Sequence, residues 1–120
     1  MTDARIMTGI DAERFAEAFL RQHSLALLQR NYRCRFGEID LIMQDGIVVV
    51  FVEVRMRKNL MFGGAAASIT PSKQQKLVHT ARHYLSSLKT TPPCRFDAVL
   101  LSSDDGREIE WIKDIICEGR

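Results

Sequence analysis

The stretch that most restricts the fold is residues 47–55, which read Ile-Val-Val-Val-Phe-Val-Glu-Val-Arg. Its run of β-branched and aromatic residues favours a strand over a helix. Because the run has no polar face, a strand built from it must be covered on both sides. A sheet with a helical layer on each face satisfies that requirement, so the chain is expected to be an α/β protein.

Shorter patterns supply the other elements. An apolar stripe at helical spacing predicts a helix over residues 11–21. A second helix is expected to open near residue 71, with Ser72 and Gln75 as a capping box, and to end before Pro92. Strands are predicted over residues 25–33, 38–43, 47–55, 95–101 and 107–112, and a loop over residues 56–69.

The predicted order of elements is α-β-β-β-α-β-β. The second helix is the crossover that lets the fourth strand lie parallel to an earlier one. The sheet of about five strands is therefore mixed and flanked by helices. The 120 residues suit one domain spanning residues 1–120.

Composition narrows the location of the protein. No apolar run approaches the roughly 18 residues of a membrane span, and the first residues lack the pattern of a secretion signal. The three cysteines, Cys34, Cys94 and Cys117, are widely spaced and odd in number. This pattern disfavours a disulfide framework or a zinc site and favours a reducing compartment, so a cytoplasmic protein without membrane contact is expected.

The charges are distributed unevenly along the chain. No acidic residue occurs between Glu53 and Asp97, although that stretch carries many basic ones. A block of one sign indicates a surface for a polyanion such as nucleic acid, while the alternative is a solvated basic face. The candidate nucleic-acid-binding residues are Arg55, Arg57, Lys58, Lys73 and Lys76.

Carboxylates interrupt the two most apolar strands, where burial demands a partner. A turn formed by Asp45 and Gly46 would set Glu38 opposite Glu53 and make Asp40 and Glu53 diagonal neighbours, about 7 Å apart. Alternation then places these acids on one face, together with Arg55. Two such carboxylates can share Mg²⁺ or Mn²⁺. A turn longer by one residue would separate them.

These motifs resemble a known family. Residues 37–42 read Gly-Glu-Ile-Asp-Leu-Ile, residues 51–55 read Phe-Val-Glu-Val-Arg, and residues 95–97 read Arg-Phe-Asp. With Glu13 in the first helix and Lys73 in the second, they resemble the YraN family of small bacterial proteins over nearly the whole chain. That family is related to archaeal Holliday-junction resolvases and to the PD-(D/E)XK nucleases. The resemblance implies a restriction-endonuclease-like core, a DNA substrate and, as in resolvases, a possible homodimer.

The resemblance also implies roles for particular residues. Asp40 and Glu53 would bind the metal, and Glu13 would complete the site. Arg55 stands where the superfamily has a lysine; it stays protonated and cannot act as a base, yet it can clamp a phosphate. Lys73 offers an ammonium group from another direction, although an exposed lysine at a helix start is the plainer interpretation.

The expected function is therefore that of a nucleic-acid-binding, nuclease-like protein, a candidate metal-dependent endonuclease for branched or distorted DNA. Its catalytic residues would be Asp40, Glu53 and Arg55. One alternative is the same fold with weak or absent hydrolysis, which the arginine favours. Another is a protein-interaction domain that uses the basic surface.

Plainer interpretations remain open for single residues. Asp40 and Glu53 can form an ion pair with Arg55 or Arg57, and Glu13 can be solvated. Glu38 can hold Arg33 or Arg35 across the strands. His79 and His83 have the spacing of zinc ligands, but no third ligand accompanies them, so they are expected to be ordinary surface histidines.

Overall fold

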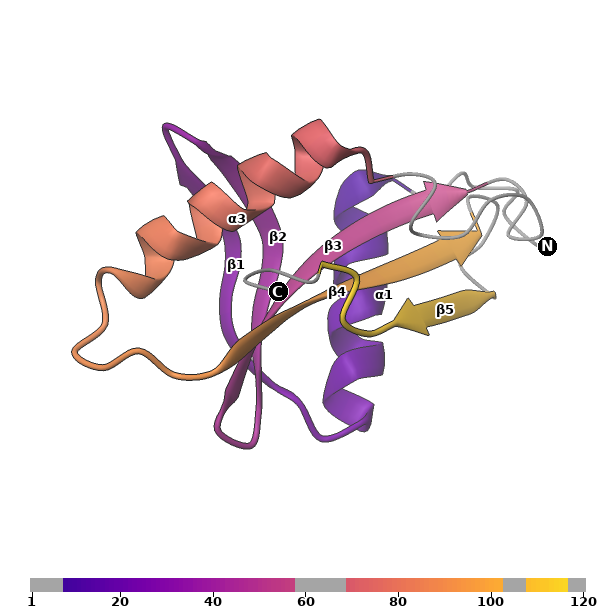
Figure 1. Cartoon of the computed structure of the whole chain (residues 1–120). Coiled ribbons are helices and arrows are strands. Elements are labelled where there is room, and N and C mark those ends of the chain that lie inside the picture. Colours follow the sequence, from indigo (N-terminus) through magenta and orange to yellow (C-terminus); the bar gives the residue numbers. More distant parts are fainter. Residues whose placement is uncertain (1–7, 58–68, 103–107, 117–120) are drawn as a thin grey trace, which may run out of the picture.

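A computed structural model describes residues 8–57, 69–102 and 108–116 and forms a five-stranded sheet between two helices (Figure 1). The elements, in chain order, are α1 (Gly9–Gln22), β1 (Ala26–Cys34), β2 (Gly37–Asp45), β3 (Val48–Arg57), α3 (Pro71–Leu85), β4 (Cys94–Ser102) and β5 (Ile109–Ile112). This order confirms the predicted α-β-β-β-α-β-β arrangement. Neither helix in the described part of the chain is long and apolar enough to span a membrane.

The strands lie in the sheet in chain order, from β1 to β5. Neighbouring strands are antiparallel except β3 and β4, which are parallel. Helix α3 makes the crossover between these two strands, because parallel neighbours cannot be joined by a tight turn. The sheet is therefore mixed, as the sequence predicts.

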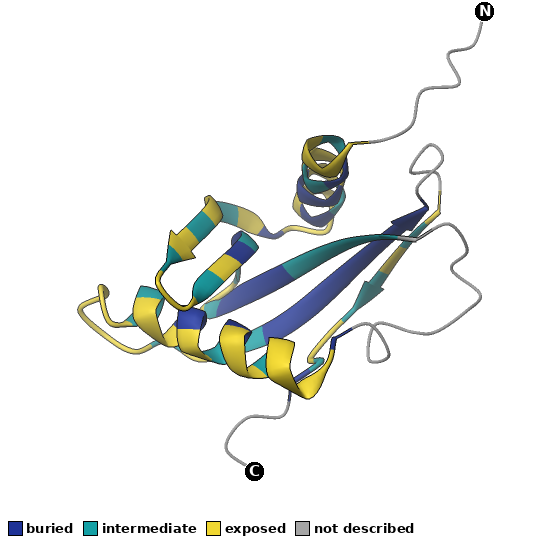
Figure 2. Cartoon of the chain, turned by 90° about the horizontal axis from the view of Figure 1, so that it is seen from above, coloured by how far each residue is buried: buried dark blue, intermediate teal, exposed yellow. Residues whose placement is uncertain are grey.

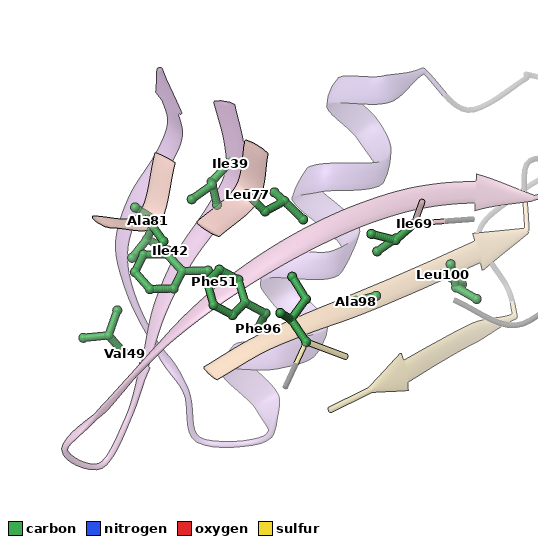
Figure 3. Packing of buried hydrophobic residues seen from close by; sticks show 11 residues of the cluster. Ile39, Ile42, Val49, Phe51, Ile69, Leu77, Ala81, Phe96, Ala98 and Leu100 are labelled. Carbon is green, nitrogen blue, oxygen red and sulfur yellow. The ribbon is translucent and has the colours of Figure 1, made fainter. Parts of the chain in front are cut away.

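The two faces of the sheet carry separate apolar clusters. Helix α1 packs on one face, where its buried side chains contact residues of β2, β3 and β4. Helix α3 covers part of the other face, and Figure 3 shows this cluster around Phe51 and Phe96. Figure 2 shows the buried residues along the central strands and on the inner sides of the helices. Burial on both faces is what the apolar run of β3 requires.

Capping residues set where both helices begin. Thr8 caps α1 in a capping box with Asp11, and the two hydrogen bonds between them are each 3.1 Å long. Helix α3 is capped by Thr70, whose hydroxyl accepts the backbone N–H of Lys73 at 3.2 Å. The predicted capping box of Ser72 and Gln75 is therefore wrong. Pro71 explains the difference, because it fits the first helical position and Thr70 directly precedes it.

The turn between β2 and β3 also corrects a prediction. Gly46 and Ile47 form it, with Gly46 at a φ of +62°, and Asp45 stays in the strand opposite Val48. Asp45 is held there because its carboxylate accepts a hydrogen bond of 3.1 Å from Arg95. The turn thus lies one residue later than expected, and each pairing partner shifts by two. A shift of two preserves which face every side chain occupies.

Asp97 connects β4 to β5 and to Asp114, which follows β5. It is fully buried, at 0% exposure, and accepts hydrogen bonds from Arg95 Nε, from Trp111 Nε1 at 3.0 Å and from the backbone N–H of Asp114 at 2.9 Å. A buried carboxylate with three donors is well compensated. It therefore holds β5 and the residues that follow against β4.

We expect Asp97→Ala to lower the free energy of unfolding by about 3 kcal/mol, because the buried donors lose a charged acceptor. Urea denaturation of the native and variant proteins measures the difference. Glu110→Ala, at an exposed position of β5, is the control and should change stability by less than about 0.5 kcal/mol. Equal effects of the two substitutions would contradict this role of Asp97.

Candidate active site

The site lies where β2 separates from β3. Their pairing ends at Leu41 and Val52. Beyond this point β2 stays paired with β1 alone, and β3 continues beside β4. Figure 1 shows the β1–β2 hairpin rising past α3 while β3 runs on along the sheet. Past such a fork the two strands lose backbone pairing partners, so a side chain of one strand can accept a backbone N–H of the other.

Asp40 is the first residue of β2 past the fork. Its Oδ2 accepts the backbone N–H of Val54 at 2.8 Å, so the side chain takes over a donor that strand pairing has released. Continuing the observed register by one residue sets Asp40 directly opposite Glu53, rather than diagonal to it as the predicted turn implied. The two acids share a face in either register, so the prediction that they lie together holds.

The Asp40 and Glu53 carboxyl groups hydrogen-bond to one another. Burial raises the pKa of Asp40. Burial and the charge of Asp40 raise the pKa of Glu53 from 4.5 to about 8, outweighing the opposing attraction of Arg55 and Lys73. At neutral pH Glu53 therefore carries a proton, which its hydrogen bond shares with Asp40.

Arg55 neutralises the charge that remains on this pair. Its Nη2 lies 2.6 Å from Glu53 Oε2, and only 13% of the Glu53 side chain is exposed. So short a contact is typical of a charged pair, whereas the raised pKa of Glu53 favours a proton on it. The short contact and the raised pKa are compatible if the proton is shared with Asp40, since one negative charge then remains for Arg55. The ion pair that was one interpretation of these acids is therefore present.

A pocket of about 320 Å³ opens beside Glu53 and Arg55. Two lysines of α3, Lys73 and Lys76, line it together with residues of β2 and β3. Both lysines are exposed, and Lys73 is near enough to lower the pKa of Glu53. Acidic residues of β2 and β3 thus line a small cavity together with basic residues of the helix. The full lining is Gly37, Glu38, Glu53, Arg55, Lys73, Lys76 and Leu77.

Gly37 brings the hairpin close to α3. Its φ of +145° lies in a region that other residues avoid, and a Cβ atom there would lie 3.3 Å from Thr80 Oγ1. Any larger residue would push the hairpin away from the helix. Glycine at this position therefore helps close one side of the pocket.

Glu13 and Glu38 lie at the edge of the site. Burial and the charge of Asp40 raise the pKa of Glu13, while a hydrogen bond with Asn31 opposes this effect. Glu38 forms an exposed ion pair of 3.3 Å with Arg33, as one interpretation expected. Within the described ranges, no three His, Cys, Asp or Glu side chains are grouped so as to hold a metal ion. The structure brings Asp40 and Glu53 together, and Glu13 as a third ligand stays a prediction.

The donor set nevertheless suits one class of metal. Mg²⁺ is commonly held by one or two carboxylates, with water and substrate phosphates filling the other positions. Asp40 and Glu53 offer oxygen atoms alone, which favours Mg²⁺ or Mn²⁺ over zinc. A divalent cation would also balance two acids that burial has forced to share a proton.

Only some of the predicted nucleic-acid-binding residues are located by the structure. Arg55, Lys73 and Lys76 line the same pocket. The backbone of Arg57 ends β3, but its side chain is not among the features that the structure describes, and Lys58 lies outside the described residues. Most of the predicted loop over residues 56–69 lies outside them as well.

The sequence patterns did not predict an aromatic cluster around Phe36. Phe36, at the turn between β1 and β2, stacks with His79 at a centroid distance of 5.6 Å. His83 meets the same phenyl ring edge-on at 6.1 Å and hydrogen-bonds to the hydroxyl of Tyr32. Both histidines are exposed, as expected, and each faces an aromatic ring. The alternation of basic and aromatic residues in residues 30–36, Arg-Asn-Tyr-Arg-Cys-Arg-Phe, is the signal that marks this hairpin.

Known proteins resemble the chain closely. The model of a family described as "Uncharacterised protein family UPF0102" matches residues 12–101. A UPF0102 protein of Nitrosospira multiformis is 68% identical over 90% of this chain and 91% of its own length. One of Nitrosomonas eutropha is 65% identical over 92% and 94%, and one of Methylobacillus flagellatus 58% over 88% and 93%. These names assign no activity.

The raised pKa of Glu53 predicts a dependence of stability on pH. Between pH 4.5 and about 8 the folded protein binds more protons at Glu53 than the unfolded chain does, so the free energy of unfolding falls as pH rises. Glu53→Gln removes this decrease. We expect variant and native protein to be equally stable near pH 4.5, and the variant to be more stable by at least about 1 kcal/mol near pH 8.

Thermal and urea unfolding at several pH values measure that difference. Glu38→Gln, at an exposed acid of the same pocket, is the matched control and should follow the native curve. A Glu53→Gln variant that parallels the native protein across the window would show that Glu53 titrates as an ordinary carboxyl group.

Proposed function

The chain belongs to the uncharacterised protein family UPF0102, the YraN family, and from that premise we propose that it is a nuclease-like protein that binds nucleic acid. The observation that carries the proposal is the half-buried Asp40–Glu53 pair, of which Glu53 lines a pocket whose other wall is basic. Membership of the family agrees with the fold but assigns no chemistry, so the argument rests on the site.

The arrangement is difficult to explain by stability alone. Two buried carboxyl groups that must share a proton are destabilising at neutral pH compared with apolar residues of similar size. Strongly shifted pKa values in a pocket are typical of functional sites. The hydrogen bond from Val54 and the ion pair with Arg55 hold both acids in place, which is the preorganisation that a reactive site needs.

The basic wall suits a phosphodiester backbone. Lys73 and Lys76 are exposed residues that line the pocket, and no residue of α3 is acidic. A phosphate between the helix and β3 would contact these cations, while Glu53 and Arg55 face it from the strand. The same contacts would orient the strand of nucleic acid without reading its sequence.

Asp40 and Glu53 would hold Mg²⁺ or Mn²⁺, which, when bound, supplies Lewis-acid stabilisation of phosphate charge and favours deprotonation of water. The chain's own residues do the rest. Arg55 fixes the position of Glu53 and, being permanently protonated, steadies negative charge without acting as a base. Lys73 adds a second cation from the helix, on the opposite wall of the pocket.

The finer assignment comes from the family resemblance. It supports DNA as the substrate, in a branched or distorted form, and a homodimer if that substrate is two-fold. A second candidate is a binding module with little or no hydrolysis. The arginine at position 55 favours this candidate, because the related nucleases have a lysine there. Arg55 is instead engaged in an ion pair with Glu53.

The test of the proposed function is cleavage of labelled branched, single-stranded and duplex DNA in Mg²⁺ or Mn²⁺. We expect the native protein to cut at least one of them, and Asp40→Asn and Glu53→Gln to reduce the rate by at least about 100-fold. Glu38→Gln, in the same pocket, is the control and should cut normally. Binding without cutting, equal in all proteins, would favour the binding module. Absence of binding at low salt would overturn the proposal.

A separate prediction concerns the metal. Titration with Mn²⁺ should raise the melting temperature of the native protein, because binding to the folded state alone stabilises it. The effect should be larger near pH 8 than near pH 6, since the cation competes with the proton shared by Asp40 and Glu53. Asp40→Asn should abolish it, whereas Glu38→Gln should not. An equal response in all three proteins would place the metal elsewhere.

A further inference from the structure

The tip of the β1–β2 hairpin presents an exposed aromatic ring beside the pocket. Phe36 is 37% exposed, and its ring stacks on His79 of α3 at an interplanar angle of 28°. The guanidinium carbon of Arg35 lies over the same ring, 4.9 Å from its centroid. A phenyl ring stacked on an imidazole, with a guanidinium over it, combines the groups on which nucleobases stack.

This ring is anchored to the apolar interior. His83 meets Phe36 edge-on and hydrogen-bonds to Tyr32. Tyr32 in turn packs against Tyr84 at 5.3 Å, and Tyr84 against the buried Phe51 at 6.0 Å. The series of contacts runs from the hairpin tip through α3 into the sheet. The exposed ring therefore has a fixed orientation, which lowers the entropic cost of binding a ligand.

The aromatic ring and the basic pocket are continuous. Gly37, which lines the pocket, directly follows Phe36, and Lys76 lies one helical turn before His79. The one acidic residue of the pocket on this hairpin, Glu38, is engaged by Arg33. A strand whose phosphates contact Lys73 and Lys76 would thus bring the neighbouring base to Phe36.

We propose that Phe36, supported by His79 and together with the Arg35 guanidinium over its ring, is a stacking site for an unpaired base of the strand that occupies the Lys73–Lys76 pocket. Inside a duplex both faces of each base are covered by its neighbours, so an internal paired base cannot lie on this ring, whereas an unpaired base can. The inference rests on the proposed function and deepens it. It assigns the substrate class as nucleic acid with a single-stranded or unpaired segment next to the site.

Binding of matched strands tests this proposal without depending on cleavage. The probes are labelled thymidine and uridine strands of about 16 nucleotides, with an abasic strand of equal length and equal phosphate charge. Fluorescence anisotropy at low salt gives the affinities. We expect the native protein to bind at least one base-bearing strand about tenfold more tightly than the abasic strand, the gain typical of stacking on one aromatic side chain. Which strand shows the advantage identifies DNA or RNA.

Two variants at Phe36 distinguish the effect of an aromatic ring from the effect of an apolar side chain alone. Phe36→Leu keeps an apolar side chain and should remove the preference for bases while leaving abasic binding unchanged. Phe36→Tyr keeps the ring and should retain the preference. Phe15→Leu changes another exposed phenylalanine, on α1, and serves as the matched control with native behaviour.

The outcomes distinguish a failure of the stacking site from a failure of the proposed nucleic-acid function. Binding of all strands with equal affinity, or a base preference that survives in Phe36→Leu, would overturn the stacking site and leave the proposed nucleic-acid function standing. Absence of binding to every strand would overturn both. Loss of the preference in Phe36→Leu alone, with unchanged unfolding temperature, supports the stacking site.

Discussion

The burial of β3 on both faces, and the point at which β2 leaves it, determine where the functional side chains lie. Helices α1 and α3 must each cover one side of this strand, because its apolar run exposes no polar face. The β2 strand follows β3 only as far as Leu41 and Val52. Past that point two strands diverge beneath α3, and the polar residues of both are free to face one another.

The carboxylate pair illustrates a balance between function and stability. Asp40 and Glu53 are half-buried and have one cationic partner, Arg55, so the second negative charge is removed by a shared proton rather than by another partner. Among the described residues outside the site, the buried acids have several donors each: Glu17, 4% exposed, accepts hydrogen bonds from both Arg21 and Arg30. The contrast identifies the fork as the place where the protein retains electrostatic strain that it relieves elsewhere.

Helix α3 joins the two parts of the proposed binding surface. Its first turns carry Lys73 and Lys76 into the pocket, and the following turn carries His79 under Phe36. Because Gly37 permits the hairpin to approach the helix, charge for the phosphates and an aromatic face for a base lie next to each other. One helix and one glycine thus connect a site on the sheet to a surface on the hairpin.

The sequence by itself determined the order of the elements and the face on which Asp40 and Glu53 lie. Both depend on local periodicity. The turn lies one residue later than predicted, but this moves each pairing partner by two residues, so both acids stay on the predicted face. Only the tertiary structure decided that Asp40 reaches Val54 and that Phe36 stacks on His79. These contacts join residues distant in sequence across a strand divergence that no local pattern encodes, since packing of the whole chain sets where two strands part.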